Sequence, residues 1–425
     1  MDSNPDFTEV LEVASQAGHI LLENGAEISR VEDIMERIAT HYGVSSGSFF
    51  VLSNGIFTTG HAEKVRKSGG QASTYANVDF IPLRGAKLSK VAAVNRLSYD
   101  IAADRCSLEE ARLRLEEIRR DPGKSPLALI LGSAISTAGF CAVFGGGFRD
   151  CLAAFIVGLL LYVFMVFVSN KYLSKIVGGI ANAFVTCALC IATWRIGLGV
   201  SLSNIIIGAV MPLVPGVAFV NGVRDLANSD YLAGLTRLTD ALLSFLYIAL
   251  GVASAFMLDG WIAGGLIDLP GMTVSPETYG YGWQALAALM GTLGFAIQYN
   301  TDREFYIPTS IVGIAGWMVY ITMFRYAGAT PAIASLAAAL VVCLLSRFFA
   351  VPFRCPAQVF VVCGIFTLVP GGGLFWFTYY LTVGQLALSS AAGFTALKVA
   401  LCIVLGIVFA MELPQRLFSR RKSAH

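Results

Sequence analysis

The stretch Met211-Pro-Leu-Val-Pro-Gly-Val-Ala-Phe-Val-Asn-Gly-Val-Arg-Asp225 lies in an apolar run that is long enough to cross a lipid bilayer. Proline lacks a backbone N–H and clashes with the carbonyl four residues before it, while glycine relaxes the backbone, so a Pro-Gly pair interrupts a helix. The carbonyls and amides released at such a break need other hydrogen-bonding partners. We therefore predict a broken helix at Pro215-Gly216.

The same pattern recurs later in the chain. Leu213-Val-Pro-Gly216 is repeated as Leu368-Val-Pro-Gly371, 155 positions further on and in another apolar run. Paired helix breaks in two halves of a chain are typical of secondary transporters, whose binding sites lie at the breaks. We predict a substrate site at these two pairs, Pro215, Gly216, Pro370 and Gly371.

The composition is that of a membrane protein. Of the 425 residues, 56% are hydrophobic and 14% charged, and the mean hydropathy is +0.68, which is far too apolar for an ordinary soluble domain. Charge is concentrated at the start, because residues 1–124 hold 15 of the 30 Lys and Arg and 18 of the 28 Asp and Glu. We predict a soluble domain over residues 1–124, followed by a polytopic α-helical membrane region.

The first residues contain no basic segment followed by an apolar one, so we expect no signal peptide and a cytosolic N-terminal domain. Its pattern is α+β. Three short β-branched and aromatic segments, near residues 48–52, 55–59 and 74–81, predict a small antiparallel sheet. Helices are expected on both sides of it, over residues 7–22, 29–43, 89–103 and 107–120.

Two of these helices begin at apparent capping boxes, Ser29-Arg-Val-Glu32 and Ser107-Leu-Glu-Glu110. The domain offers little for catalysis, because it has no phosphate loop, no metal-spaced His and Cys set and no nucleophile elbow. Arg30 and Glu32 follow a glycine turn and could form a site, but a solvated helix face with one ion pair is the simpler interpretation. We expect a cytosolic gate or regulator and no enzyme activity.

Ten apolar runs follow the soluble domain, each near the roughly 20 residues that a helix needs to cross a bilayer. We expect them at about residues 125–145, 151–169, 176–194, 201–224, 236–258, 283–300, 306–325, 331–347, 357–380 and 392–413. With a cytosolic N-terminus, the outer connections hold few basic residues, and the inner ones and the basic tail over residues 414–425 hold the rest, as the positive-inside rule requires. Both termini are therefore expected in the cytosol.

The offset of 155 extends beyond the breaks. It also aligns Gly139 with Gly294 and Gly251 with Gly406. Five helices per half is an odd number, so the second half would enter the membrane from the opposite side. We predict two inverted five-helix repeats, over residues 125–258 and 283–413.

Few polar residues lie within the predicted spans, and ionisable ones there are functional candidates. Asp240 could couple transport to protons, or it could pair with Arg237 or Arg224. Asn182 either faces a cavity at the breaks or forms an interhelical hydrogen bond. Asn221 and Arg224 follow the first break, where a carboxylate substrate would benefit from the amides of a half-helix N-terminus and from a nearby Arg.

Cysteine and histidine offer no metal or redox chemistry. The nine cysteines lie mostly in apolar runs, and Cys187-Ala-Leu-Cys190 is set among small apolar residues, where packing is the simpler explanation for the spacing. The four histidines lie outside the predicted spans. We expect no cofactor, no metal and no nucleic-acid partner. Small residues four apart, such as Gly251 and Ala255, permit close helix contacts within a subunit or in a homo-oligomer.

Four motifs together resemble the threonine/serine exporter family. They are Asn24-Gly-Ala-Glu-Ile-Ser-Arg-Val-Glu-Asp-Ile-Met35, Pro212-Leu-Val-Pro-Gly216, Gly222-Val-Arg-Asp-Leu226 with Leu232-Ala-Gly-Leu-Thr-Arg237, and Gly364-Ile-Phe-Thr-Leu-Val-Pro-Gly371. The resemblance covers nearly the whole chain and implies a bacterial inner-membrane exporter of threonine and serine, driven by the proton motive force. Members of this family that are split into two proteins are linked instead to the export of dicarboxylates such as succinate. The chain departs from the pattern at Cys363-Gly364, where a further Pro-Gly is expected.

The leading hypothesis is a proton-coupled exporter that works by alternating access. Its zwitterionic or dicarboxylate substrate would lie between the two breaks, near Asn182, and Asp240 would carry the coupling proton. Two other classes remain open. A channel would suit the many glycines, and a membrane-anchored enzyme or sensor would use the N-terminal domain for its chemistry.

Overall fold

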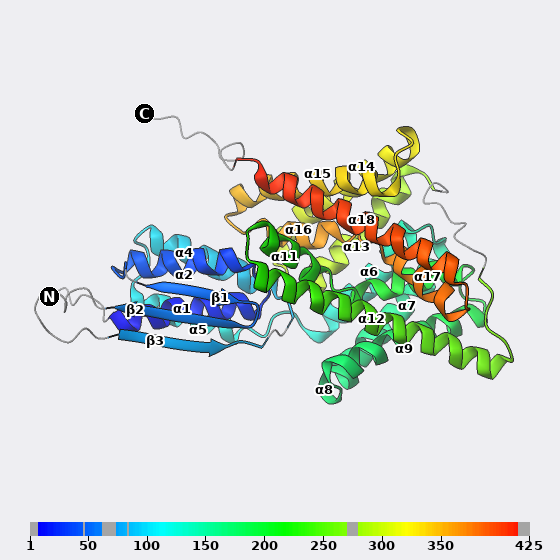
Figure 1. The fold of residues 1–425 in the computed structure, drawn as a ribbon, viewed down its shortest axis with the longest axis horizontal. Helices are drawn as coiled ribbons and strands as arrows, with labels where there is room; N and C mark the ends of the chain where they lie inside the picture. The colour runs from blue at the N-terminus through cyan, green and yellow to red at the C-terminus, as the bar shows by residue number, and fades with distance from the viewer. Residues whose placement is uncertain (1–6, 46, 62–73, 83–84, 270–278, 415–425) are drawn as a thin grey trace, which may run out of the picture. The chain divides into compact units, whose positions relative to one another are not determined.

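The computed structural model describes residues 7–45, 47–61, 74–82, 85–269 and 279–414 (Figure 1). The chain forms two compact units. The first consists of the chain up to Gly123 together with residues 217–239 and 352–358, and the second contains the remaining residues. The first unit thus includes two segments from the apolar part of the sequence. The domain boundary at residue 124, which follows from the distribution of charge, does not predict this.

Over its described residues, the N-terminal part of the first unit has the predicted order of two helices, three strands and two helices. The elements are α1 (Phe7–Glu23), α2 (Ile28–His41), β1 (Ser48–Leu52), β2 (Gly55–His61), β3 (Thr74–Phe80), α4 (Leu88–Ala102) and α5 (Leu108–Arg120). The strands form one antiparallel sheet in the order β1-β2-β3. Phe57 of β2 is paired with Phe50 of β1 on one side and with Val78 of β3 on the other.

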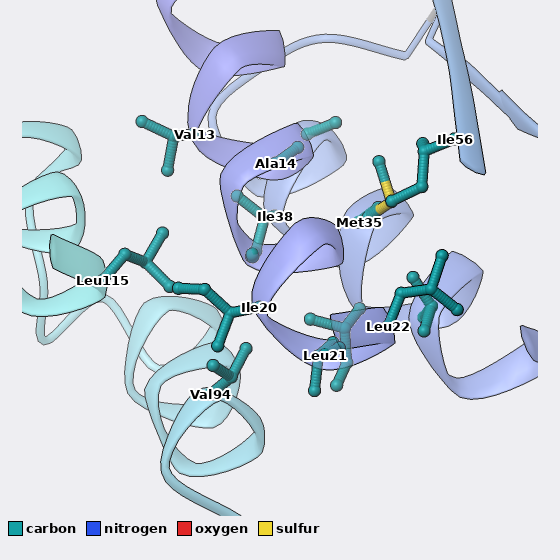
Figure 2. Close-up of a cluster of buried hydrophobic side chains, with 14 of the residues drawn as sticks. Val13, Ala14, Ile20, Leu21, Leu22, Met35, Ile38, Ile56, Val94 and Leu115 are labelled. Carbon is teal, nitrogen blue, oxygen red and sulfur yellow. The ribbon is translucent and has the colours of Figure 1, made fainter. Parts of the chain in front are cut away.

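Helix α1 is the centre of this part of the unit. Apolar residues recur at helical spacing on most of its surface, so it is buried among several elements rather than along one stripe. Figure 2 shows Val13, Ala14, Ile20 and Leu21 of α1 surrounded by side chains from α2, α4, α5 and β2. The apolar periodicity that predicts the helices therefore also specifies which faces form the core.

The two predicted capping boxes have different outcomes. Ser107 is the N-cap of α5, where its hydroxyl accepts a hydrogen bond from the backbone N–H of Glu110 at 3.2 Å. Ser29 is not an N-cap, so that prediction is wrong. Helix α2 begins one residue earlier, at Ile28, after the extended residue Glu27.

The side chain of Glu32 contacts the sheet, whereas the simpler interpretation of the sequence places it in an ion pair on a solvated helix face. One carboxylate oxygen of Glu32 accepts the backbone N–H of Val51 at 3.1 Å, which attaches α2 to β1. Burial raises the pKa of the Glu32 carboxyl, and the hydrogen bond from Val51 opposes that rise in part.

The apolar part of the chain is almost wholly helical (Figure 1). Its α-helices are α6 (Pro126–Val143), α7 (Phe148–Phe164), α8 (Asn170–Tyr172), α9 (Lys175–Arg195), α10 (Leu202–Val210), α11 (Gly216–Ala227), α12 (Tyr231–Ala263), α13 (Tyr281–Gln298), α14 (Tyr306–Tyr326), α15 (Pro331–Phe353), α16 (Gln358–Ile365), α17 (Gly371–Thr382) and α18 (Leu386–Glu412). A π-helical turn, Met165–Ser169, joins α7 to α8.

Each of the ten apolar runs contains a helix or a broken pair of helices. Among the described residues, seven helical segments are long and apolar enough to cross a membrane by themselves, and an eighth results if α10 and α11 form one span. The chain is therefore a multi-pass membrane protein, and the number of ten spans stays a prediction.

The helix bounds repeat at the offset of 155. Helix α6 starts and ends 155 positions before α13, and α11 starts and ends 155 positions before α17. Contacts in the second unit repeat in the same way. A methyl group on Gly139 of α6 would lie 2.4 Å from the N of Gly291 on α13, and one on Gly294 of α13 would lie 2.5 Å from the N of Ser136 on α6. Because 136 and 139 become 291 and 294 at this offset, the α6–α13 contact is reciprocal.

Candidate functional site

Both Pro-Gly pairs break a helix, as predicted. At the first, α10 passes into a 3₁₀ turn, Met211–Leu213, and α11 begins at Gly216. At the second, α16 continues through Cys363 and Gly364 to Ile365, and α17 begins at Gly371. The departure from the family pattern at Cys363-Gly364 thus leaves α16 continuous there.

The backbone follows the same course at each break. The N–H of Gly216 donates to the carbonyl of Val214 at 2.8 Å, and the N–H of Gly371 donates to the carbonyl of Val369 at 2.7 Å. Each valine in turn donates to the carbonyl three residues before it, Met211 at 3.1 Å and Phe366 at 3.3 Å. These local bonds replace the helical ones that proline removes.

The two breaks lie against one another within the second unit. A methyl group on Gly216 would come within 2.3 Å of Cζ of Phe366, and one on Gly371 would come within 2.7 Å of Sδ of Met211. Met211 and Phe366 each stand four residues before the proline of their own break. Each glycine is therefore covered by the residue at the corresponding place before the other break.

A cavity of about 360 Å³ lies beside the second break, in the second unit. Pro370, Gly372 and Gly373 form part of its wall, so the first turn of α17 faces it. Five aromatic rings line it, those of Phe144, Trp317, Tyr320, Phe324 and Trp376. Its polar side chains are neutral, those of Ser203, Asn204, Ser335, Thr367 and Thr395, and no described residue in the lining is charged.

The cavity has unused hydrogen-bonding capacity. The N–H of Gly371 is bonded to Val369, but those of Gly372 and Gly373 follow it in the first turn of α17, where N–H groups have no partner within the helix and carry the positive end of its dipole. Ser335, on α15, is 1% exposed, and its hydroxyl oxygen is buried without a hydrogen-bond partner in the described part of the chain. Such a buried hydroxyl is destabilising unless a ligand or water completes it. The arrangement can hold a small molecule with a carboxylate and a further polar group.

A second cavity, of about 220 Å³, lies where the two breaks meet. Met211 and Val214 of the first break and Gly371 of the second contribute to its wall, together with apolar residues of α12 and α17. It offers few polar groups, so it suits apolar contact and movement of the breaks more than recognition of a polar substrate.

Asn182 is buried on α9, and its side-chain oxygen has no hydrogen-bond partner among the described residues. It does not line either cavity at the breaks. Asp240 forms an ion pair with Lys175, and both side chains are partly exposed. The partners considered for Asp240 from the sequence, Arg237 and Arg224, pair with other acids.

Asn221 and Arg224 belong to the first unit, where the structure gives them protein partners. The side-chain amide of Asn221 donates to the carbonyl of Gly25 at 2.7 Å. Arg224 forms an ion pair with Glu27, with 2.9 Å between Nη2 and Oε2. The sequence did not single out Glu27 or Gln358 as site residues, and only the repetition at offset 155 could have drawn attention to Met211 and Phe366.

No metal centre is apparent in residues 7–414 as far as they are described, because no three His, Cys, Asp or Glu side chains gather there in a way that could hold an ion.

Comparison with known proteins gives a consistent result for both halves of the chain. Residues 12–259 match a family described as "Putative threonine/serine exporter", and residues 284–412 match one described as "Threonine/Serine exporter, ThrE". Over 96% of its length the chain is 24% identical to a threonine/serine exporter of Corynebacterium glutamicum, of which it covers 83%. No solved structure matches the chain.

Other relatives carry other names. A probable succinate transporter subunit of Klebsiella aerogenes is 24% identical over 59% of this chain and 96% of its own length. An uncharacterized protein of Schizosaccharomyces pombe is 24% identical over 67% of this chain, and the chain spans 35% of the length of that relative.

Proposed function

Since the chain belongs to the threonine/serine exporter family, we propose that it is a secondary active exporter of small polar metabolites, with threonine and serine as the first candidates. We place it in the bacterial inner membrane, with both termini in the cytosol. The observation that carries the proposal is the cavity beside Pro370, which combines the first turn of α17, the unpartnered hydroxyl of Ser335 and a neutral aromatic wall.

The chemistry of the cavity favours an amino acid over a dicarboxylate. A zwitterion has no net charge, and its carboxylate can be held by the amides of Gly372 and Gly373 in the first turn of α17. A dianion would bring two negative charges to a wall in which no described residue is cationic, and an unpaired buried charge is strongly unfavourable. The hydroxyl of threonine or serine could complete the hydrogen bonding of Ser335.

The two breaks provide a way to move this site. We propose that the segments 125–258 and 283–413 are inverted repeats and that alternating access arises from movement of one against the other. The reciprocal contacts of Gly216 with Phe366 and of Gly371 with Met211 support this, because equivalent residues of the two segments meet there. The apolar cavity between the breaks leaves room for the rearrangement.

Proton coupling remains assigned to Asp240 in this proposal. Protonation would neutralise the Asp240 carboxylate and release Lys175, which changes the charge on α9 and α12 together. An ion pair that forms and breaks in each cycle gives a proton a means to alter the contact between two helices.

Efflux from proteoliposomes tests the function. Vesicles that contain the purified protein and labelled threonine, serine or succinate are diluted into buffer with and without a pH gradient. We expect gradient-dependent efflux of threonine and serine that saturates with substrate, and little efflux of succinate. Leakage of unrelated solutes at similar rates would identify a channel, and transport that survives removal of the N-terminal domain would argue against an anchored enzyme.

A further inference from the structure

The loop that connects α1 to α2 is held by side chains from two distant parts of the sequence, all within the first unit. The carbonyl of Gly25 accepts hydrogen bonds from Nδ2 of Asn221 at 2.7 Å and from Nε2 of Gln358 at 2.6 Å. The same Gln358 nitrogen also lies 3.0 Å from Oδ1 of Asn221. One backbone carbonyl thus joins a residue of α11 to the first residue of α16.

The next residues of the loop are held in the same way. The carbonyl of Ala26 accepts from Nη2 of Arg237 at 2.9 Å, and the N–H of Ile28 donates to Oδ1 of Asp225 at 3.2 Å. The hydroxyl of Ser29 accepts from the side-chain amide of Asn228 at 3.0 Å. The polar contacts therefore continue from Gly25 into the first turn of α2.

Two ion pairs lie at the centre of this contact. Glu27 pairs with Arg224 at 2.9 Å, and Asp225 pairs with Arg237 at 2.8 Å. The four side chains are nearly or wholly buried, with exposures of 5%, 11%, 0% and 4% in that order. Buried pairs of this kind are often no more stabilising than apolar residues of the same volume, so stability alone does not account for them.

The contact is also incompletely satisfied. Among the described residues, Nη1 of Arg224 and Oε1 of Gln358 are buried without a hydrogen-bond partner, although Nη2 of Arg224 is paired with Glu27. A buried polar network in which some members lack partners is less stable than a complete one. Such incomplete hydrogen bonding is expected of a contact that opens during function, because a permanently closed contact would be more stable with every buried polar group partnered.

The residues that hold the loop lie near both helix breaks in the amino-acid sequence. Asn221 stands five residues after Gly216 on α11, and Gln358 opens α16, the helix that leads into the second break. The loop therefore contacts the continuation of one break and the approach to the other at the same time. Because they share the carbonyl of Gly25, neither of these two segments can withdraw from the loop without loss of a hydrogen bond.

We propose that residues 25–29 form a cytosolic latch, which holds the segments next to both breaks together and must release them once in each transport cycle. This inference rests on the proposed transport function. It gives the N-terminal domain a specific role, in which the α1–α2 loop sets the rate of the conformational change, and Glu27, Asn221, Arg224 and Gln358 determine how firmly the latch is closed.

A reversible covalent lock tests the latch. In the full-length protein, Ser29→Cys and Asn228→Cys place two thiols where a side-chain hydrogen bond now joins exposed or half-buried residues. The disulfide is formed with a mild oxidant and verified by mass spectrometry, and a short bifunctional thiol reagent is used if oxidation is incomplete. We expect the disulfide-locked protein to lose at least nine-tenths of its threonine efflux and to regain it after reduction. If the bifunctional reagent is used instead, the efflux that remains should be proportional to the fraction of protein that is not cross-linked.

The matched control joins two elements inside the N-terminal domain. His19→Cys and Asp79→Cys replace a pair in contact at 2.6 Å between α1 and β3, and we expect this lock to leave efflux unchanged. Full efflux with the 29–228 lock in place would overturn the latch. Absence of threonine and serine efflux from the unmodified protein would instead overturn the proposed function.

Hydrogen exchange provides a readout that does not depend on transport. Asn221→Ala with Gln358→Ala removes both donors to Gly25, and we expect the amides of residues 25–29 to exchange at least tenfold faster while those of α4 are unchanged. Equal protection in the variant and the wild type would show that these donors do not hold the loop closed and would contradict the latch.

Discussion

The ring of Phe366 lies directly against Gly216, so closely that a methyl group on Gly216 would come within 2.3 Å of Cζ of the ring. Phe366 also packs against Phe295, with ring centroids 4.1 Å apart, so the ring has little room to withdraw. The contact joins the two helix breaks and makes Gly216 a position where no side chain fits without movement.

The first prediction concerns this contact. Gly216→Ala should lower the stability of the protein by roughly 1–3 kcal/mol through overpacking and reduce transport sharply, and Phe366→Leu should restore part of both. Thermal unfolding in detergent and efflux measure the two effects. Gly265→Ala is the control, because a methyl group there meets nothing within 4 Å. Gly371→Ala should be milder than Gly216→Ala, since the atom that it meets, Sδ of Met211, belongs to a flexible side chain.

The second prediction concerns the α6–α13 contact. Gly139→Ala and Gly294→Ala would each place a methyl group within 2.5 Å of a backbone nitrogen, which cannot move without moving its helix. Each should lower the melting temperature clearly, because overpacking should reduce the free energy of unfolding by roughly 1–3 kcal/mol or more. Gly282→Ala, also on α13 but with open space around it, should be neutral or slightly stabilising. Equal effects of the three substitutions would argue against the close contact.

The third prediction concerns Ser335. Ser335→Ala should raise KM for threonine and serine about two- to tenfold, the effect of a lost neutral hydrogen bond of roughly 0.5–1.5 kcal/mol. Thermal stability should stay the same or rise slightly, because the hydroxyl is buried without a partner in the described structure. A fall in stability with no change in KM would mean that Ser335 is a packing residue and does not contact the substrate.

The fourth prediction concerns Asp240. Asp240→Asn should make efflux independent of the pH gradient, while downhill exchange of threonine continues, because the amide can no longer exchange a proton. Lys175→Gln is the companion variant. It removes the partner of Asp240 but keeps the carboxylate, so it should shift the pH dependence of transport without abolishing coupling. Coupling that persists in Asp240→Asn would exclude this residue from the mechanism.

The fifth prediction concerns pH and the N-terminal domain. Burial raises the pKa of Glu32 above its usual 4.5 in the folded protein, so the folded state holds this proton more tightly than the unfolded state does. The contribution of Glu32 to stability therefore falls as the pH rises from 4.5 through the raised pKa. Glu32→Gln, which keeps an oxygen for the N–H of Val51, should become more stable than the wild type across that window. Parallel pH profiles of the two proteins would contradict this.

Much of the architecture can be predicted from local patterns in the sequence. Proline and glycine at 215–216 and 370–371 act on their own backbone, so the helix breaks follow from the residues alone. The three strands and the flanking helices of the N-terminal domain follow from apolar periodicity. Ser29 is the exception, because its hydroxyl bonds Asn228, a residue that is 199 positions away and that no local pattern reveals.

The pairing of charges could not be predicted in this way. Asp240 lies close in sequence to Arg237, yet it pairs with Lys175, and Arg237 pairs with Asp225. Residues three apart on a helix can meet, but the partner is decided by the elements that pack nearby and by how deeply each charge is buried. The burial of Glu27 and the contacts of Gln358 depend in the same way on segments that the chain order separates.

The sequence by itself thus determined the family, the helical membrane architecture, the two breaks and their separation of 155 residues, because these depend on composition and on residues close together in the chain. Only the tertiary structure decided that Gly216 meets Phe366, that a neutral cavity with Ser335 in its wall lies beside the second break, and that the α1–α2 loop is held by residues 221–237 and 358. These are contacts between surfaces that form only when distant segments pack, and no single segment carries the information to specify them.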